Sequence, residues 1–242
     1  MFVALSKIAW FALQPVSIIL LLGLIAAVFA LALVRGVFLV EDTLRRARIP
    51  SWLCPAVAGV GVAGLSLIDS RILGVGYEAT SAALAGDYAL ELLVALAALK
   101  LVATALCLGG GFVGGVFSPS LVLGALAGGT FGLLLAAVAP EHVSASGAYA
   151  LAGMGAVAGA VLGAPVSTAV MIVELTGDFS FTLAVLGAVV VASLVTRSLG
   201  LRSFFHRQID RRRRPVDQRP QPEAPAPADA PPPAPGAQSS SR

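Results

Sequence analysis

The stretch GGGFVGGVFSPS, residues 109–120, determines how the rest of this chain is interpreted. It lies between two long apolar runs, and glycines at this density break a helix rather than extend it. Irregular backbone at membrane depth is tolerated only where protein buries it or where it lines a polar cavity. We expect Ser118 and Pro119 to act as the N-cap and first residue of a helix that runs on from Ser120. The free N–H groups at such a helix end attract anions, so the stretch predicts an anion site.

The composition is that of an integral membrane protein. Hydrophobic residues make up 57% of the chain, charged residues make up 12%, and the mean hydropathy is +0.91. A soluble domain carries about 25% charged residues. The formal net charge is +3, but the basic residues gather at the C-terminal end of the apolar region, which indicates membrane topology rather than a nucleic-acid surface. We therefore expect a lipid bilayer as the environment and no nucleic-acid partner.

The first apolar run, residues 16–40, follows Pro15 and exceeds the roughly 20 residues that a spanning helix needs. It is followed by a charged segment, residues 41–48, which we interpret as a basic loop and place in the cytoplasm by the positive-inside rule. A shorter run covers residues 52–68. Residues 69–87 are predicted to form a polar loop or a short re-entrant piece.

A further span is predicted over residues 88–108, with Lys100 in its middle. Ionisable residues inside a membrane are functional candidates because burying their charge is costly. Two other interpretations of Lys100 stay open, since its side chain can snorkel to the interface or face neighbouring helices. Glu174, near the end of a later apolar segment, has no role that the pattern defines.

Small residues recur at four-residue spacing in the next two predicted helices. The predicted helix over residues 121–139 contains Gly124, Gly128 and Gly132. The helix over residues 148–162 contains Gly155 and Gly159, and Gly163 follows it directly. Glycines at this spacing let helices approach closely in lipid. Both helices are therefore predicted to be buried within the protein.

Pro165 begins a short apolar segment over residues 165–175, and a last span is predicted over residues 181–199. Several of the apolar segments are too short to cross a membrane alone. Short, interrupted helices that meet near the middle of a membrane are typical of transporter binding sites. We assign residues 1–210 to a membrane domain of this kind.

The last part of the chain, residues 211–242, begins with an arginine cluster and continues as Pro- and Ala-rich sequence. Such a composition cannot bury a core, so it predicts a disordered tail. The arginines place the C-terminus in the cytoplasm of a multi-pass protein of the cell membrane.

Enzymatic chemistry finds no candidate residues in this sequence. Gly109, Gly111 and Gly114 match the spacing of a dinucleotide-binding fingerprint, but they follow an apparent membrane helix and no lysine or suitably spaced acidic residue comes after them. Cys54 and Cys107 lie in apolar stretches without histidine or acidic neighbours. We predict no enzyme activity, no cofactor, no metal site and no disulfide.

An anion site at the break needs only backbone. Gly114 and Gly115 remove the side chains that would screen the backbone, and the amides of Val116 and Phe117 would face a buried anion. Backbone dipoles suit chloride or a similar small anion, because conduction requires ligands weak enough to release it. In the alternative interpretation, these glycines only allow a tight turn between packed helices.

At these residues the chain resembles a known family. GGVFSP, residues 114–119, is similar to the GGxFxP signature of the CLC family of voltage-gated chloride channels and chloride/proton antiporters. Residues 152–178, AGMGAVAGAVLGAPVSTAVMIVELTGD, resemble the next two helices of that family, and the resemblance extends over residues 11–209. It implies an all-α integral membrane fold of tilted, broken and re-entrant helices, like the second inverted-repeat half of the CLC fold.

The resemblance also implies a function and its residues. It implies chloride transport by a homodimer with one anion pathway per subunit, with helices near the first span and near residues 174–199 forming the dimer interface. Chloride is expected to be bound at Gly115, Val116 and Phe117. The family places a tyrosine hydroxyl near the anion at the start of its last helix, and Phe205 occupies that position here without the hydroxyl.

The first-half motifs of the family, GSGIP and the gating-glutamate motif G[KR]EGP, have no counterpart in this sequence. We therefore expect an incomplete chain that supports little gated transport alone. The alternative is a non-transporting membrane interaction module that dimerises or pairs with a separately encoded first half. Channel and proton-coupled exchange both stay open.

Overall fold

The structure is a computed structural model that describes residues 15–140, 146–177, 182–200 and 203–209. The chain divides into two compact units, Met1–Phe205 and His206–Arg242. The first unit is the membrane domain described below, and residues 206–209 of the second are helical. The predicted tail, residues 211–242, lies outside the described residues.

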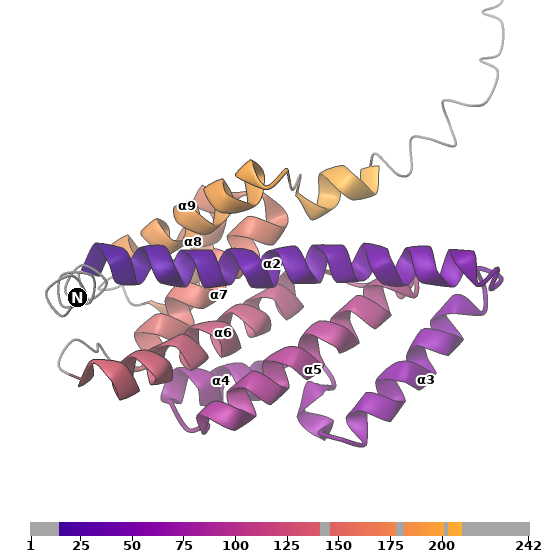
Figure 1. The fold of residues 1–242 in the computed structure, drawn as a ribbon, viewed down its shortest axis with the longest axis horizontal. Helices are drawn as coiled ribbons and strands as arrows, with labels where there is room; N and C mark the ends of the chain where they lie inside the picture. The colour runs from indigo at the N-terminus through magenta and orange to yellow at the C-terminus, as the bar shows by residue number, and fades with distance from the viewer. Residues whose placement is uncertain (1–14, 141–145, 178–181, 201–202, 210–242) are drawn as a thin grey trace, which may run out of the picture. The chain divides into compact units, whose positions relative to one another are not determined.

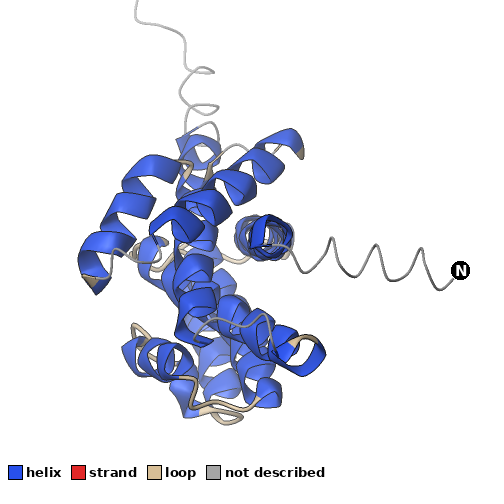
Figure 2. Ribbon diagram, turned by 90° about the vertical axis from the view of Figure 1, so that its left-hand side faces the viewer, coloured by secondary structure: helices blue, strands red, loops and turns tan. Residues whose placement is uncertain are grey.

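All regular structure in the described residues is helical (Figure 2). This confirms the all-α fold class. In chain order the elements are α2 (Pro15–Arg46), α3 (Cys54–Ser66), the short 3-10 helix η1 (Ser70–Ile72), α4 (Tyr77–Ala85), α5 (Leu90–Gly109), α6 (Phe117–Val138), α7 (Ser146–Leu162), α8 (Pro165–Thr176) and α9 (Thr182–Ser198) (Figure 1).

Within the described residues, three helices are long and apolar enough to cross a membrane, namely α2, α5 and α6. The other apolar helices, α3, α7, α8 and α9, are shorter, at 10–17 residues each. Short helices of this kind need neighbours to complete a crossing. The predicted mixture of full spans and interrupted helices is thus confirmed.

The first helix is longer than predicted. We expected a basic loop over residues 41–48, but α2 continues to Arg46. The reason is local, because Arg45 and Glu41 stand four residues apart and form an ion pair of 2.7 Å on the helix surface. Arg45 and Arg46 also lie in the last turn, where positive charge offsets the helix dipole.

The glycines of α6 bring it into backbone contact with α7. A Cβ added at Gly124 would fall on the carbonyl oxygen of Gly153, and one at Gly128 would fall on that of Tyr149. Glycine is thus required here for close approach, as the four-residue spacing predicted. The glycine of α7 that meets α6 is Gly153, which is outside the predicted set.

The predicted glycines of α7, Gly155 and Gly159, lie against α9 rather than α6. A Cβ at Gly155 would lie 3.0 Å from Val185, and one at Gly159 would lie 2.7 Å from Val189, both on α9. Helix α7 is therefore packed on two sides, and its side chains Ala156, Val157 and Val161 are fully buried. The prediction that this helix is buried within the protein is confirmed.

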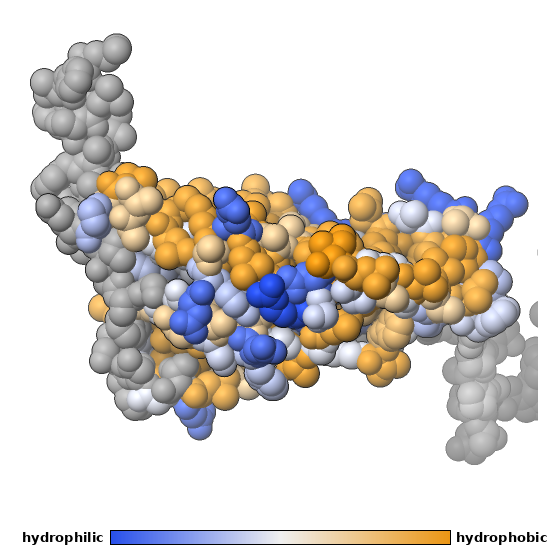
Figure 3. Space-filling view, turned by 90° about the horizontal axis from the view of Figure 1, so that it is seen from below, coloured by the Kyte–Doolittle hydropathy of each residue, from blue (hydrophilic) through white to orange (hydrophobic). Residues whose placement is uncertain are grey.

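Large apolar side chains are also exposed in many places, and apolar atoms cover much of the face seen in Figure 3. On α2 the exposed set is Val16, Leu20, Leu21, Leu24, Val28 and Leu39. A helix that is apolar on every side is typical of a membrane span. These surfaces fit a lipid environment and mark the chain as an integral membrane protein.

Candidate functional site

The glycine-rich stretch breaks the chain between two spanning helices, as predicted. Helix α5 ends at Gly109, Gly111 adopts a left-handed conformation with φ of 90°, and α6 begins at Phe117. Only glycine adopts that φ without strain, so Gly111 makes the turn. The break itself is residues 110–116.

The predicted helix cap is wrong. Val116 occupies the N-cap position without a side-chain hydrogen bond, so Ser118 and Pro119 are the second and third residues of α6. The Val116 side chain is buried at 2% exposure, and this packing starts the helix earlier than the local sequence indicates. Pro119 still lies in the first turn of α6. Backbone N–H groups there have no acceptor within the helix, so the missing N–H of proline costs no helix hydrogen bond.

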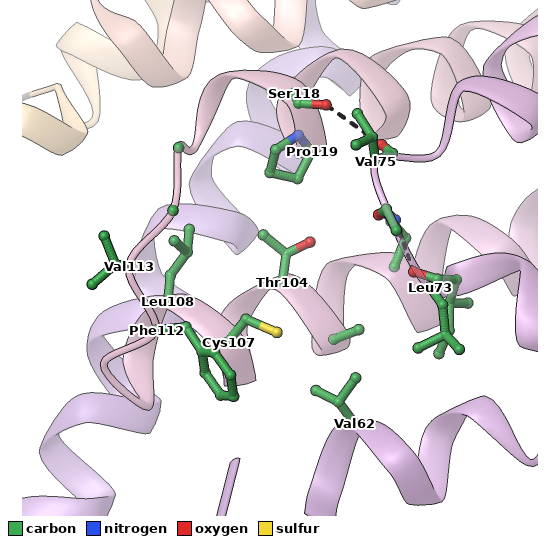
Figure 4. Close-up of a pocket in the computed structure, with 16 residues that line it drawn as sticks. Val62, Leu73, Val75, Thr104, Cys107, Leu108, Phe112, Val113, Ser118 and Pro119 are labelled. Carbon is green, nitrogen blue, oxygen red and sulfur yellow. Dashed lines mark hydrogen bonds between the residues drawn. The ribbon is translucent and has the colours of Figure 1, made fainter. Parts of the chain in front are cut away.

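The Ser118 hydroxyl has a partner far away in the sequence. It donates a long hydrogen bond of 3.4 Å to the carbonyl oxygen of Val75, as Figure 4 shows. Since no side chain caps α6, the N–H groups at its start remain available as hydrogen-bond donors. The amides of Gly115, Val116 and Phe117 have no hydrogen-bond acceptor among the residues that the structure describes.

A cavity of about 450 Å³ lies beside this helix end (Figure 4). Four of the predicted site residues line it, namely Gly114, Gly115, Ser118 and Pro119. The other lining residues come from α3, from the segment before α4, from α5 and from the break itself, namely Val62, Ile72, Leu73, Gly74, Val75, Lys100, Ala103, Thr104, Cys107, Leu108, Phe112 and Val113. The cavity is mostly apolar, and its polar side chains are Lys100, Thr104 and Ser118.

Three predicted residues do not line this cavity. Val116 turns its side chain into the core, and Phe117 is half-buried. Phe205 is 46% exposed, and its ring meets the edge of Phe204 at 5.7 Å between centroids. Phe204 in turn stacks on Phe38 of α2 at 5.9 Å.

Packing does not explain Gly114 and Gly115. A Cβ added at either would meet nothing within 4 Å, and neither residue has a positive φ. In contrast, a Cβ at Gly109 would lie 2.6 Å from the Val37 carbonyl oxygen. A tight turn between packed helices thus accounts for Gly109 and Gly111 but not for Gly114 and Gly115.

Lys100 lies in the cavity wall and is 5% exposed. Its ammonium donates hydrogen bonds to the carbonyl oxygens of Ile72 at 2.8 Å and Gly74 at 2.9 Å. Of the three interpretations left open, snorkelling is excluded by this burial. The sequence marked Lys100 as unusual but contained no signal for its partners, which are backbone atoms.

The segment that accepts these bonds, residues 69–76, is called the strap below. Its first residue, Asp69, accepts a hydrogen bond of 2.9 Å from the backbone N–H of Arg71 and one of 3.1 Å from its side chain. Mainly because of the backbone bond, the pKa of the Asp69 carboxyl is lowered below its ordinary value. The Arg71 guanidinium also lies 5.7 Å from the ring centroid of Tyr88.

This lowered pKa predicts a small pH dependence. A carboxylate with a lowered pKa in the fold stabilises the fold at neutral pH, and this contribution is lost as the pH falls through the lowered pKa. We expect Asp69→Asn to melt at a slightly lower temperature than the wild type at pH 7. The difference should shrink as the pH falls through the lowered pKa of Asp69, because protonation then makes the Asp69 side chain as neutral as the asparagine. Equal melting temperatures of the two proteins at pH 7 would contradict this.

Comparisons with known proteins give the family of the sequence and the fold. The sequence profile of the family described as "Voltage gated chloride channel" matches residues 3–197. The H(+)/Cl(-) exchange transporters ClcA of Citrobacter koseri and Salmonella arizonae are each 33% identical over 153 residues, which is 63% of this chain and 32% of the relative. The chain therefore spans about a third of the length of these curated relatives.

A solved structure has a similar fold. The crystal structure of a slow cyanobacterial Cl-/H+ antiporter superposes with a TM-score of 0.74 at 24% identity, over 81% of this chain and 47% of that chain. The TM-score shows a shared fold. The predicted resemblance in fold is thus confirmed.

Proposed function

Because the chain belongs to the voltage-gated chloride channel family, we propose that it forms part of a pathway that carries chloride, or a similarly small anion, across a membrane. The anion is bound at the N-terminal end of α6 by the amides of Val116 and Phe117, with Gly115 giving it access to the backbone. The whole transporter works by chloride/proton exchange, as the names of the similar ClcA proteins and of the similar solved structure indicate for those proteins.

The observation that carries this proposal is the open space over Gly114 and Gly115. Neither turn geometry nor packing requires glycine there, yet both residues line the cavity directly before a set of free amides. Bare backbone beside unpaired N–H groups is what an anion needs for close approach. Backbone donors also hold a halide weakly enough for release.

Phe205 is proposed as a further contact of the anion pathway. Its half-exposed ring contacts the ring of Phe204, and Phe204 is buried against Phe38. An aromatic edge carries partial positive charge and is compatible with a halide.

Assembly and topology are proposed on separate grounds. Helices α8 and α9 expose Val166, Val170, Leu175, Leu183 and Leu194, each at least 59%. This apolar face supports a homodimer joined through these helices. The basic ends of α2 and α9 support a cell-membrane protein with a cytoplasmic C-terminus.

The proposal predicts that Gly115→Leu weakens chloride binding without unfolding the protein. The leucine side chain fits the open space but covers the amides, so the apparent affinity is expected to fall about tenfold. Chloride NMR line broadening on the purified chain in detergent measures binding in the weak range. Gly64→Leu is the matched control, because Gly64 on α3 also has nothing within 4 Å of an added Cβ.

Two results would overturn the proposal. One is a wild-type chain that broadens the chloride signal no more than empty micelles do. The other is equal broadening by wild type, Gly115→Leu and Gly64→Leu. Chloride efflux from proteoliposomes that contain this chain alone distinguishes binding from transport, and little gated efflux is expected.

A further inference from the structure

Lys100 is the charged side chain that the anion site leaves unexplained. It lies in the middle of α5, is 5% exposed, and has no acidic partner within ion-pair distance in the described part of the chain. A charge in such a place is retained only when it has a function or strong hydrogen-bond partners. Its partners are the carbonyl oxygens of Ile72 and Gly74.

Three carbonyl oxygens of the strap accept their hydrogen bonds from side chains. No other donor reaches the carbonyl oxygens of Ile72 and Gly74 among the described residues, and Val75 accepts only from Ser118. The strap, which contains η1 and leads into α4, is thus connected to α5 through Lys100 and to the first turn of α6 through Ser118.

The strap also lies directly against α6. A Cβ added at Gly76 would lie 2.9 Å from Val122 of α6 and 3.4 Å from the Lys100 ammonium. Gly76 has a φ of 89°, so its conformation also favours glycine. The strap therefore contacts the second turn of α6 at Val122 and is bonded to the first turn, which follows the free amides, through Ser118.

We propose that Lys100 is a positioning residue that fixes the strap across the cavity and, through Val75 and Ser118, holds the first turn of α6 in its anion-binding position. This inference rests on the proposed function. An ammonium suits the task because it has three donors, of which two reach carbonyls of one segment. The effect on the anion passes through the strap and does not require Lys100 to touch the anion.

The first test measures the strap itself. In Lys100→Met, amide hydrogen exchange in residues 69–76 is expected to rise about tenfold or more, because two charge-assisted hydrogen bonds are lost. Lys100→Arg should keep exchange near the wild-type rate. Thr104→Val is the matched control, since Thr104 lines the same cavity on the same helix and makes no contact that holds the strap. Unchanged exchange in Lys100→Met would overturn the proposal.

The second test measures chloride by NMR line broadening in a double-mutant cycle of Lys100→Met and Ser118→Ala. If Lys100 acts through the strap, its removal weakens chloride binding about tenfold in the wild-type background and much less once Ser118 is replaced. Equal effects in both backgrounds indicate a direct electrostatic role and would overturn the positioning role. So would unchanged chloride binding in Lys100→Met.

These readouts separate the two proposals. If the wild type does not bind chloride, the proposed function fails, and the inferred link to the anion fails with it. If the wild type binds chloride and Lys100→Met binds it equally well, only the positioning role fails. Circular dichroism checks that each variant is folded. If Lys100→Met does not fold, Lys100→Arg is compared with the wild type instead.

Discussion

Replacing Gly128 by alanine is expected to lower the free energy of unfolding of the membrane domain by about 3 kcal/mol, through overpacking against α7. The new methyl group would fall on the Tyr149 carbonyl oxygen and lie 2.9 Å from the Cα atom of Ala150. These are backbone atoms, so no rotamer change relieves the clash. The two helices must separate, and contacts along the whole interface weaken. Denaturation in mixed micelles, followed by circular dichroism, measures the loss.

The adjacent glycine is the control for this prediction. A Cβ added at Gly129 would lie 3.5 Å from Leu93, an ordinary contact distance. Gly129→Ala gains the same helix propensity as Gly128→Ala, so their difference isolates the packing against α7. Equal stability of the two variants would show that α6 and α7 do not meet through Gly128.

The second large effect is expected at Leu33, which is fully buried on α2. Leu33→Ala should reduce the free energy of unfolding by about 2 kcal/mol, near the lower end of the range for buried leucines. The hydrophobic transfer contribution is small because lipid tails are as apolar as the protein core. What remains is the loss of packing contacts around the cavity left behind. The same micelle denaturation assay applies.

Leu24 provides the comparison on the same helix. Its side chain is 48% exposed, so Leu24→Ala should change stability little. If the free energy of unfolding falls equally in Leu24→Ala and Leu33→Ala, the buried face of α2 differs from the one described. A loss confined to Leu33→Ala would locate the packed face of α2 by experiment.

Local sequence signals were enough to predict most helix boundaries. The predicted spans of residues 88–108 and 165–175 correspond to Leu90–Gly109 and Pro165–Thr176. In both cases an apolar run is bounded by glycine or proline, which act on the backbone wherever they occur. The charged end of α2 is predicted as a loop because a helix end that carries an ion pair has the same composition as a charged loop.

Boundaries that depend on distant contacts could not be predicted. The start of α6 is set by burial of Val116, while the Ser118 hydroxyl bonds to a residue 43 positions earlier instead of capping the helix. Nothing near Ser118 in the sequence distinguishes these two uses of a serine.

The candidate site was predicted in part for the same reason. Gly114, Gly115, Ser118 and Pro119 come from one stretch, so they lie together as expected. The strap was missed because Lys100 binds carbonyl oxygens, which every residue has and no side-chain pattern marks. Glu174, which the sequence left without a role, is exposed on α8.

The packing of α2 has a consequence for biosynthesis. Helix α2 is the first described helix, yet it contacts α9, which begins only at Thr182, as well as α5, α6 and α7. Its inner face, including Leu22, Ala26 and Leu33, is therefore uncovered while the later helices are still being made. Because α2 is apolar on every side, lipid can solvate that face in the interim. Membrane insertion can thus precede assembly, and the bundle closes around α2 only after the ribosome has delivered α9.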